Sequence, residues 1–510
     1  MGHALEDLAK QAQLDATLSE PGGHAAPGVK REAVASRTEQ KESSLYQGRV
    51  HVYPKAISGT FRRVKWAALV VLLAIYWVLP WIRWDRGPGA PDQAVMIDMA
   101  GRRAYFFWIE IWPQEVYFLT GILILAAFGL FLATSLFGRV WCGFACPQTV
   151  WTDLYMWVER RIEGDRSARI RLDKSPWSAE KWRKKISKHA VWLLIAFATG
   201  GAWIFYFGNA PDMLVDALTG QASGPIYFFV GLFTFTTYLL AGHAREQVCT
   251  YMCPWPRIQG ALFDEDTLAV TYERWRGEPR GPVRKGQGFE GRGDCIDCKQ
   301  CVAVCPTGID IRDGLQLECI GCALCIDACN EVMDKVGRPR NLITYDSARN
   351  TALREDREAP RYRIFRPRTL IYVVLLTVVG SVMTWGLLTR AEAHLSVERD
   401  RSGLFVTLSD GSVRNSYLLK IHNKTHDPQL YTLDIEGLPE SAVVWVQGRE
   451  PEALGSLRLR AEPDTVVSYT LMIAAPPSDL EAPSVDLDFT ITAENGAVAT
   501  QDSVFRGPER

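Results

Sequence analysis

Residues 295–329 read CIDCKQCVAVCPTGIDIRDGLQLECIGCALCIDAC and hold eight of the chain's twelve cysteines. These cysteines fall into two frames of one spacing, C-x2-C-x2-C-x3-C, and Pro306 follows the first frame. Thiolates at this pitch are the ligands of two-cluster ferredoxins, in which the fourth cysteine of each run binds the other run's cluster. The spacing therefore predicts two [4Fe–4S] clusters.

The crossing of the fourth cysteines predicts which thiols share a cluster. Ligand set A is Cys295, Cys298, Cys301 and Cys329, and ligand set B is Cys319, Cys322, Cys325 and Cys305. Zinc is the alternative, because paired CxxC motifs also supply four thiolates. Zinc sites rarely add a third cysteine at the same step and a fourth followed by proline. The pattern thus favours clusters, and a chain that carries them transfers single electrons.

Five apolar runs have the length needed to cross a bilayer. They cover residues 66–82, 116–137, 190–207, 225–241 and 370–388 approximately. The first run starts too far from Met1 to be a cleaved signal peptide. Segment 141–158 is also apolar, but Asp153 and Glu159 favour an interfacial helix there. We therefore expect an α-helical integral membrane protein with about five spans.

Lysine and arginine predict the orientation of the spans. Lys55, Arg62, Arg63 and Lys65 stand ahead of the first span, twelve basic residues lie in the connection 139–188, and the connection 208–224 has none. This asymmetry places the N-terminus and both ligand sets in the cytoplasm, and residues 391–510 outside. The cysteines agree, because none follows Cys329 and the cytoplasm keeps thiols reduced. The net charge of −1 gives no reason to expect nucleic acid as a partner.

The two ends of the chain differ from its middle in composition. Residues 1–50 are rich in Ala, Glu, Gln, Gly and Ser, and we expect a disordered cytoplasmic tail. Residues 391–510 contain short alternating runs separated by Asp-Gly and Asn-Gly turn signals, which predicts an all-β sandwich. His422 and His426 are expected to be exposed loop residues rather than metal ligands.

The other four cysteines form two copies of one pattern, CxxxCP. The copies are GRVWCGFACP at residues 138–147 and REQVCTYMCP at residues 245–254. Each copy follows the second helix of a hydrophobic hairpin, which indicates an internal duplication. On a helix, the i, i+4 spacing places both sulfurs of a pair on one face, and the proline ends or kinks that helix.

These four thiols, called the thiol group below, are Cys142, Cys146, Cys249 and Cys253. We expect them at the cytoplasmic boundary of the membrane, on the same side as the ligand sets. Four converging soft thiolates suit Cu(I), zinc or another iron–sulfur centre. The alternative is four small buried residues, since free cysteine behaves as a hydrophobe. Two matched copies favour a ligand or redox role, whereas His243 is expected to be an interfacial histidine rather than a base or ligand.

Four stretches of the chain resemble the FixG/CcoG (RdxA) family, accessory proteins in the assembly of cbb3-type cytochrome c oxidase. They are GRVWCGFACPQTVWT (138–152), CTYMCPWPR (249–257), GDCIDCKQCVAVCPTGID (293–310) and ECIGCALCIDACNEVM (318–333). The resemblance runs from about residue 51 to the C-terminus. One departure from the general ferredoxin pattern is Asn330, which stands where a proline usually follows the run.

The resemblance implies reduction of Cu(II) to Cu(I) for the copper centre of the oxidase. Copper would be the substrate, the thiol group would be the catalytic, copper-holding residues, and a soluble donor would supply electrons to the clusters. It also implies copper-transporting ATPases, copper chaperones and cbb3 assembly factors as partners. The location would be the bacterial inner membrane, with residues 391–510 as a periplasmic immunoglobulin-like domain. A homodimer is compatible with the sequence.

The expected organisation has five parts. They are a tail (1–50), a membrane domain (51–248), a ferredoxin-like domain (249–369), a last transmembrane helix (370–390) and the β-sandwich (391–510). Two other functions stay open. A quinol-linked electron relay would use the same thiols and clusters, although the sequence offers no clear quinone pocket. A redox sensor or assembly scaffold would use the β-sandwich to dock onto oxidase subunits.

Overall fold

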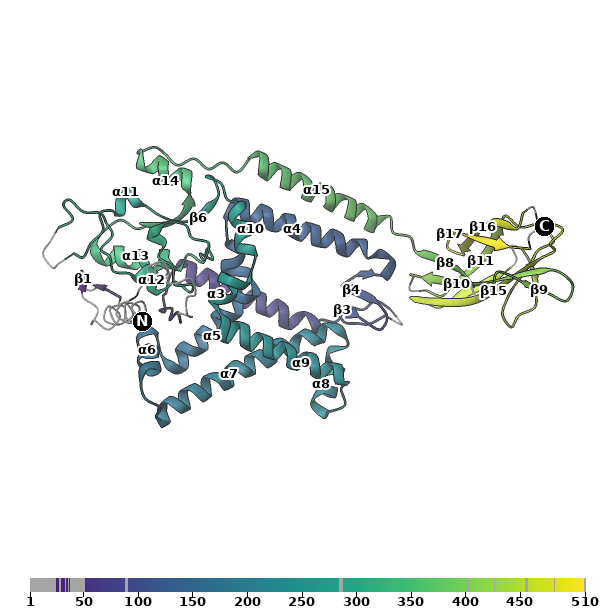
Figure 1. Ribbon diagram of the computed structural model, residues 1–510, viewed down its shortest axis with the longest axis horizontal. Coiled ribbons are helices and arrows are strands. Elements are labelled where there is room, and N and C mark those ends of the chain that lie inside the picture. Colours follow the sequence, from purple (N-terminus) through teal and green to yellow (C-terminus); the bar gives the residue numbers. More distant parts are fainter. Residues whose placement is uncertain are drawn as a thin grey trace, which may run out of the picture. The chain divides into compact units, whose positions relative to one another are not determined.

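The computed structural model divides the chain into two compact units (Figure 1). One unit contains residues 1–82 and 94–381, and the other contains residues 83–93 and 382–510. The residues that the structure describes are 24–26, 29–32, 34, 36, 51–87, 90–283, 288–400, 403–425, 427–454, 457–480 and 482–508. All twelve cysteines lie in the first unit.

Each of the five apolar runs predicted from the sequence is a helix in the structure. By length and composition, five helices of the described residues could cross a membrane. Their bounds are Thr60–Val78 (α3), Tyr117–Phe137 (α4), Ala179–Ile204 (α7), Gly224–Thr237 (α9) and Pro367–Leu388 (α15). Large apolar side chains on them are exposed, for example Leu123 at 62% and Leu194 at 67%. Such exposure suits contact with lipid.

Shorter elements join these helices. They are β3 (Val95–Asp98), β4 (Arg103–Phe106), β5 (Ile109–Ile111), α5 (Pro147–Glu163), α6 (Arg166–Lys174) and α8 (Ala210–Thr219). A three-stranded antiparallel sheet of β3, β4 and β5 connects α3 to α4, and α8 connects α7 to α9. Helices α7 and α9 pack along each other (Figure 1). Each hairpin, α3–α4 and α7–α9, thus consists of two long helices, but a small sheet connects the first pair and a short helix connects the second.

Two acidic residues of α5 are buried, although they were the reason to expect an interfacial helix. Asp153 is 1% exposed and Glu159 is 3% exposed. Arg62 pairs with Asp153 at 2.8 Å. Glu159 pairs with Arg245 at 2.9 Å and with Arg169 at 2.8 Å. The acidic residues of this segment belong to a buried ion-pair network, so they do not mark a face turned to water.

A Glu159→Gln variant is expected to lose about 3–5 kcal/mol of stability, because two arginines stay buried without a counter-ion. Burial alone would raise the pKa of Glu159, but the charges of Arg245 and Arg169 lower it to about 2. A carboxyl with a lowered folded-state pKa stabilises above its unfolded pKa of about 4.3 and loses that effect only as pH falls further. Thermal unfolding in detergent should show this deficit unchanged from pH 8 to about pH 5.

The matched control for this variant is Glu180→Gln. Glu180 forms an exposed pair with Lys184 one turn along α7, and such pairs contribute little. Equal unfolding temperatures for the Glu159 and Glu180 variants would contradict the buried network.

The ferredoxin-like part repeats one backbone conformation in its two cysteine frames. Its elements are β6 (Leu268–Tyr272), α12 (Gln300–Ala303), α13 (Leu324–Val336) and β7 (Ile343–Ser347), and β6 pairs antiparallel with β7. Asp297 and Gly321 occupy equivalent positions, with φ of 48° and 69°. Lys299 and Ala323 are equivalent as well, with φ of 54° and 58°, and each precedes a helix. Two loops of equal spacing thus fold in the same way.

The expectation of a disordered tail does not hold for the described residues among 29–36. Val29 is 3% exposed, and Arg31 pairs with Asp297 at 2.6 Å. The amide of Glu32 donates to the carbonyl of Cys298 at 3.0 Å. These contacts join the segment to the loop of ligand set A. Most of the predicted tail 1–50 lies outside the described residues.

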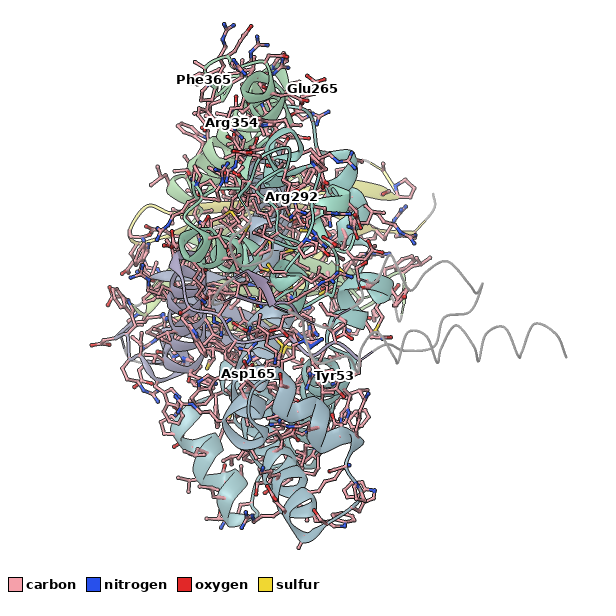
Figure 2. All side chains as sticks on the ribbon, turned by 90° about the vertical axis from the view of Figure 1, so that its left-hand side faces the viewer. Tyr53, Asp165, Glu265, Arg292, Arg354 and Phe365 are labelled. Atoms are coloured by element: carbon pink, nitrogen blue, oxygen red, sulfur yellow. The ribbon has the colours of Figure 1, made fainter. Side chains whose placement is uncertain are left out.

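The chain that follows the tail also has fixed contacts. The Lys55 amide donates to the carbonyl of Ala303 at 2.8 Å, on α12. The Ala56 amide donates to Oδ1 of Asp165 at 2.9 Å, and Figure 2 shows Tyr53 and Asp165 in the same region. Residues 51–59 therefore connect the ferredoxin-like part with the start of α6.

The second unit is an antiparallel β-sandwich, as predicted. One sheet has the order β13-β12-β15-β10-β8 with β9 beside β10, and the other has the order β14-β11-β16-β17. The strands are β8 (Ala393–Arg399), β9 (Val406–Thr407), β10 (Val413–Asn423), β11 (Gln429–Glu436), β12 (Val443–Val446), β13 (Glu452–Ala453), β14 (Arg458–Ala461), β15 (Thr465–Ala475), β16 (Ser484–Ala493) and β17 (Val498–Arg506). Alternate side chains of β10, Tyr417, Leu419 and Ile421, are fully buried. This alternation builds the core.

The expectation for His422 is wrong. His422 lies within β10, is 5% exposed, and faces His394 of β8 with ring centroids 5.2 Å apart. Its position is set by strand register rather than by a loop, which is why it is buried. His426 lies outside the described residues.

Candidate functional site

Two small cavities lie among the predicted cluster ligands. Cys295, Cys298, Cys301 and Cys329 line one cavity, and Cys305, Cys319, Cys322 and Cys325, with Cys301, line the other. Cys329 of the second run therefore lies with the first run, and Cys305 of the first run lies with the second. The four cysteines of set A thus lie around one cavity, and the four cysteines of set B lie around the other.

The donors around the two cavities fit [4Fe–4S] clusters. Each cavity is lined by the four thiols of its ligand set on a largely apolar wall, which at set B includes Ile311 and Ile320. Burial raises the pKa of Cys298 to about 11 and of Cys319 to about 12. Thiols this hard to ionise become thiolates when a positive metal centre binds them. Among the described residues, no three His, Cys, Asp or Glu side chains are grouped to hold one metal ion, as zinc would need.

In each pair of the thiol group, the first cysteine lies in a single π-helical turn and the second cysteine is the residue that ends this turn. The first thiol turn is Trp141–Ala145 (η4), and the second is Val248–Met252 (η7). Each turn closes with a backbone bond of 2.8 Å from the amide of its second cysteine, Cys146 or Cys253, to the residue five positions earlier. A π turn replaces the helix expected from the spacing, and such turns occur often at functional sites.

The internal duplication is visible in the backbone before each thiol turn. Gly138 has φ 56° and ψ −127°, and Arg245, four residues before Cys249, has φ 44° and ψ −115°. Only glycine adopts this region readily, so Arg245 is strained. Its buried ion pair with Glu159 and its bond to the Gly242 carbonyl at 2.8 Å hold it in place.

The four thiols of the group interact with one another. Burial raises the pKa of Cys142 to about 12, and Cys146, Cys249 and Cys253 each raise it further. Burial also raises the pKa of Cys249 to about 12, with Cys146 and Cys253 adding to the rise. Cys142 and Cys249 pack against the apolar cluster that includes Cys322 of ligand set B. The thiols therefore converge beside set B, without closing around one ion among the described residues.

The first thiol turn touches the loop of ligand set B through its backbone. A Cβ added to Gly143 would lie 3.0 Å from the carbonyl carbon and oxygen of Gly321 and from the oxygen of Ile320. Both of these residues lie between Cys319 and Cys322. Glycine at position 143 thus allows the thiol turn and the cluster loop to meet.

A Gly143→Ala variant is expected to lose about 1–3 kcal/mol of stability, because the added methyl overpacks a contact between two backbones. The thiol turn should also move away from the set B loop. Thermal unfolding checks the loss of stability. Gly129→Ala is the control, since a Cβ there meets nothing within 4 Å. Wild-type values for Gly143→Ala would contradict the contact.

Two side chains that the sequence did not single out fix Cys142 and its turn. The Cys142 thiol donates to Oε1 of Gln259 at 3.2 Å. Arg139 donates to the carbonyls of Leu317 and Cys319, the second at 2.6 Å, and to that of Pro256 at 3.0 Å. Arg139 stands in the GRVWC motif, but its partners are more than 100 residues away, so the motif alone could not show its role.

A third small cavity lies beside Cys249. Thr307 and Ile320 line both this cavity and that of ligand set B. Lys65, which is 3% exposed, also lines it and pairs with Asp153 at 3.9 Å. Arg245 lines it too, and its Nη1 has no hydrogen-bond partner among the described residues. Two buried cationic residues thus contribute to the wall of this cavity.

His243 packs among aromatic rings. Its ring stacks on that of His189 at 5.7 Å and lies 5.0 Å from Tyr238 and 6.2 Å from Trp192. The sequence predicts an interfacial histidine here, and the structure places the His243 ring in contact with three other rings.

Comparison with known proteins adds to this geometry. Residues 244–348 match the family model described as a 4Fe-4S dicluster domain, and residues 383–508 match the model described as an IG-like fold at the C-terminal of FixG. Nitrogen fixation protein FixG of Rhizobium meliloti (strain 1021) is 50% identical over 460 residues, which are 85% of this chain and 88% of that protein. The chain belongs to the FixG family.

Two further relatives of this FixG-family protein match it with similar identity and coverage. Protein RdxB of Cereibacter sphaeroides is 51% identical over 434 residues, covering 84% of this chain and 88% of RdxB. Protein RdxA of that organism is 52% identical over 396 residues, covering 77% and 84%. Residues 119–164, which include the first thiol turn, match a model described as a 4Fe-4S binding domain. The chain is therefore an iron–sulfur redox protein with helices suited to a membrane.

Proposed function

We propose that this protein reduces Cu(II) to Cu(I) at the thiol group, for assembly of a cbb3-type oxidase. The observation that carries the proposal is the direct contact between the first thiol turn and the loop of ligand set B, through Gly143 and Gly321. A metal at the thiols would lie next to an electron source. Thiolates prefer soft Cu(I) over Cu(II), so the site itself favours reduction.

In this proposal the clusters, the thiols, Gln259 and Arg139 have separate roles. When bound, the two clusters supply single electrons, which they receive from a soluble donor protein. Each Cu(II) gains one electron, and thiols that bind it release their protons to water. Gln259 accepts the proton of Cys142 in a hydrogen bond while no copper is present. Arg139 holds the first thiol turn on the set B loop through backbone carbonyls.

The orientation belongs to the same proposal. Basic residues are concentrated before α3 and between α4 and α7, which supports a cytoplasmic place for the ligand sets and the thiol group. The β-sandwich would then lie in the periplasm, where it could meet oxidase assembly factors. Copper-transporting ATPases and copper chaperones are the proposed suppliers and receivers of the metal.

Anaerobic assay of the purified protein tests the proposal. Protein with a full complement of clusters, given dithionite-reduced viologen and Cu(II), should form Cu(I) far faster than cluster-free protein. Metal analysis should find about eight irons, as two clusters require, and copper only when it is added. About twelve irons would instead place a third cluster at the thiol group and overturn copper binding there. Stoichiometric zinc would overturn the cluster assignment.

A quinol-linked relay is the second candidate, and the third cavity favours it. Its cationic lining residues, Lys65 and Arg245, suit the oxygens of a quinone headgroup. Quinol added to the oxidised protein without copper should then reduce the clusters and bleach their visible absorption. Unchanged absorption at saturating quinol would remove this candidate and leave copper reduction untouched.

A further inference from the structure

Each ligand set has one buried arginine beside it, and the two arginines are neutralised differently. Arg139 at set B is 5% exposed, and Arg312 at set A is 4% exposed. A positive charge held near a cluster favours its reduced, more negative state, and burial weakens the screening of that charge by solvent. The ion pairs of each arginine should therefore influence the reduction potential of the cluster at its ligand set.

At set A, carboxylates offset the charge of Arg312. Arg312 pairs with Asp310 at 2.6 Å and with Asp297 at 2.8 Å. Its Nη1 lies 3.8 Å from the sulfur of Cys295. Asp297 also pairs with Arg31 at 2.6 Å, but Arg31 is 42% exposed and is screened by water. Two carboxylates thus surround the one buried guanidinium at this set.

At set B, no carboxylate of the described residues lies within ion-pair distance of Arg139. Its three hydrogen bonds all go to backbone carbonyls, one of them the carbonyl of Cys319. Arg139 therefore places its positive charge directly against the backbone of the set B loop, at the carbonyls of Leu317 and Cys319.

The other charges near set B largely balance. Lys65 acts on Cys322, and it shares Asp153 with Arg62. The carboxylate of Asp327 accepts the backbone amides of Phe61 and Arg62. Within the described part of the chain, Arg139 forms no ion pair with a carboxylate, whereas Lys65 and Arg62 both pair with Asp153.

We propose that Arg139 makes ligand set B the more easily reduced of the two sets, while it holds the first thiol turn against the set B loop. Electrons would then rest at the set that touches the thiol group. Arg139 is a positioning residue, because it acts through the Cys319 loop and touches no substrate. This inference goes beyond copper reduction, and it would stand if copper were not the final acceptor.

A redox titration of the full-length, cluster-loaded protein, followed by EPR and without copper, tests the inference. Two midpoint potentials are expected, and the higher one should vanish in Cys319→Ser. Arg139→Gln should lower the higher midpoint potential and leave the lower one unchanged. Arg139→Lys keeps the positive charge, so most of the difference between the two midpoint potentials should remain. Arg257→Gln, which changes an exposed arginine of α10 (Trp255–Ala261), should alter neither.

Three results would overturn the inference. The first is an Arg139→Gln variant that has its full iron content and both midpoint potentials unchanged. The second is a Cys319→Ser variant in which the higher midpoint potential is still observed. Should Arg139→Gln fail to keep its iron, Asp310→Asn decides, because it leaves the Arg139 contacts intact and removes a carboxylate at set A. The lower potential should then rise toward the higher one, and an unchanged lower potential is the third overturning result.

Discussion

Cys305→Ser is expected to lose the cluster of ligand set B, even though Cys305 belongs to the first cysteine run. The reason is the cavity that it lines, which it shares with Cys319, Cys322 and Cys325 rather than with Cys295. Loss of one thiolate from a four-cysteine site removes a covalent anchor that serine replaces poorly, because its hydroxyl is a harder ligand. Iron analysis should show about half of the wild-type iron.

The matched comparison for Cys305→Ser uses one variant from each run. The EPR spectrum and potential of the surviving cluster should equal those of Cys319→Ser and differ from those of Cys295→Ser. Cys329→Ser should show the converse behaviour and match Cys295→Ser. A Cys305→Ser spectrum identical to that of Cys295→Ser would contradict the crossed ligand sets.

The double variant Cys142→Ser/Cys146→Ser should reduce Cu(II) at least about 100-fold more slowly than the wild type. Loss of groups that only support a metal's ligands already costs about 10–100-fold, and here the soft ligands themselves are removed. The ligand sets do not include these residues, so the iron content and cluster EPR spectrum should stay as in the wild type. Cys249→Ser/Cys253→Ser should have an effect of similar size.

Ala145→Ser is the control for the thiol variants, because it adds a hydroxyl to the first thiol turn and keeps both thiols. Its rate should stay near that of the wild type. A double cysteine variant that retains both its clusters and the wild-type rate would remove the thiol group from the reaction.

Local patterns in the sequence predicted the parts of the fold that depend on neighbouring residues. The cysteine frames predicted both ligand sets, because three thiols of each cluster come from one short loop. Apolar runs predicted the five helices, and alternation predicted the β-sandwich, because both patterns follow from the periodicity of the backbone. The duplicated CxxxCP pattern predicted two equivalent thiol pairs, which the matching backbone at Gly138 and Arg245 now shows.

Features that depend on distant partners could not be predicted in this way. Asp153 and Glu159 suggested an interface because their partners Arg62 and Arg245 lie more than 80 residues away in the sequence. The meeting of Gly143 with Gly321 joins two motifs separated by a helical hairpin and α10. His422 was misjudged because strand register, rather than composition, places it opposite His394.

The central claim is that electrons held at the ligand sets pass to copper at the thiol group. The most direct measurement is an anaerobic single turnover of pre-reduced protein, freed of reductant and mixed with Cu(II) and a Cu(I)-specific chelator. The account predicts about two Cu(I) per chain, one for each one-electron cluster, formed as the EPR signals of the reduced clusters disappear. Reduced-cluster signals that persist in the presence of Cu(II), with no Cu(I) formed, would contradict it.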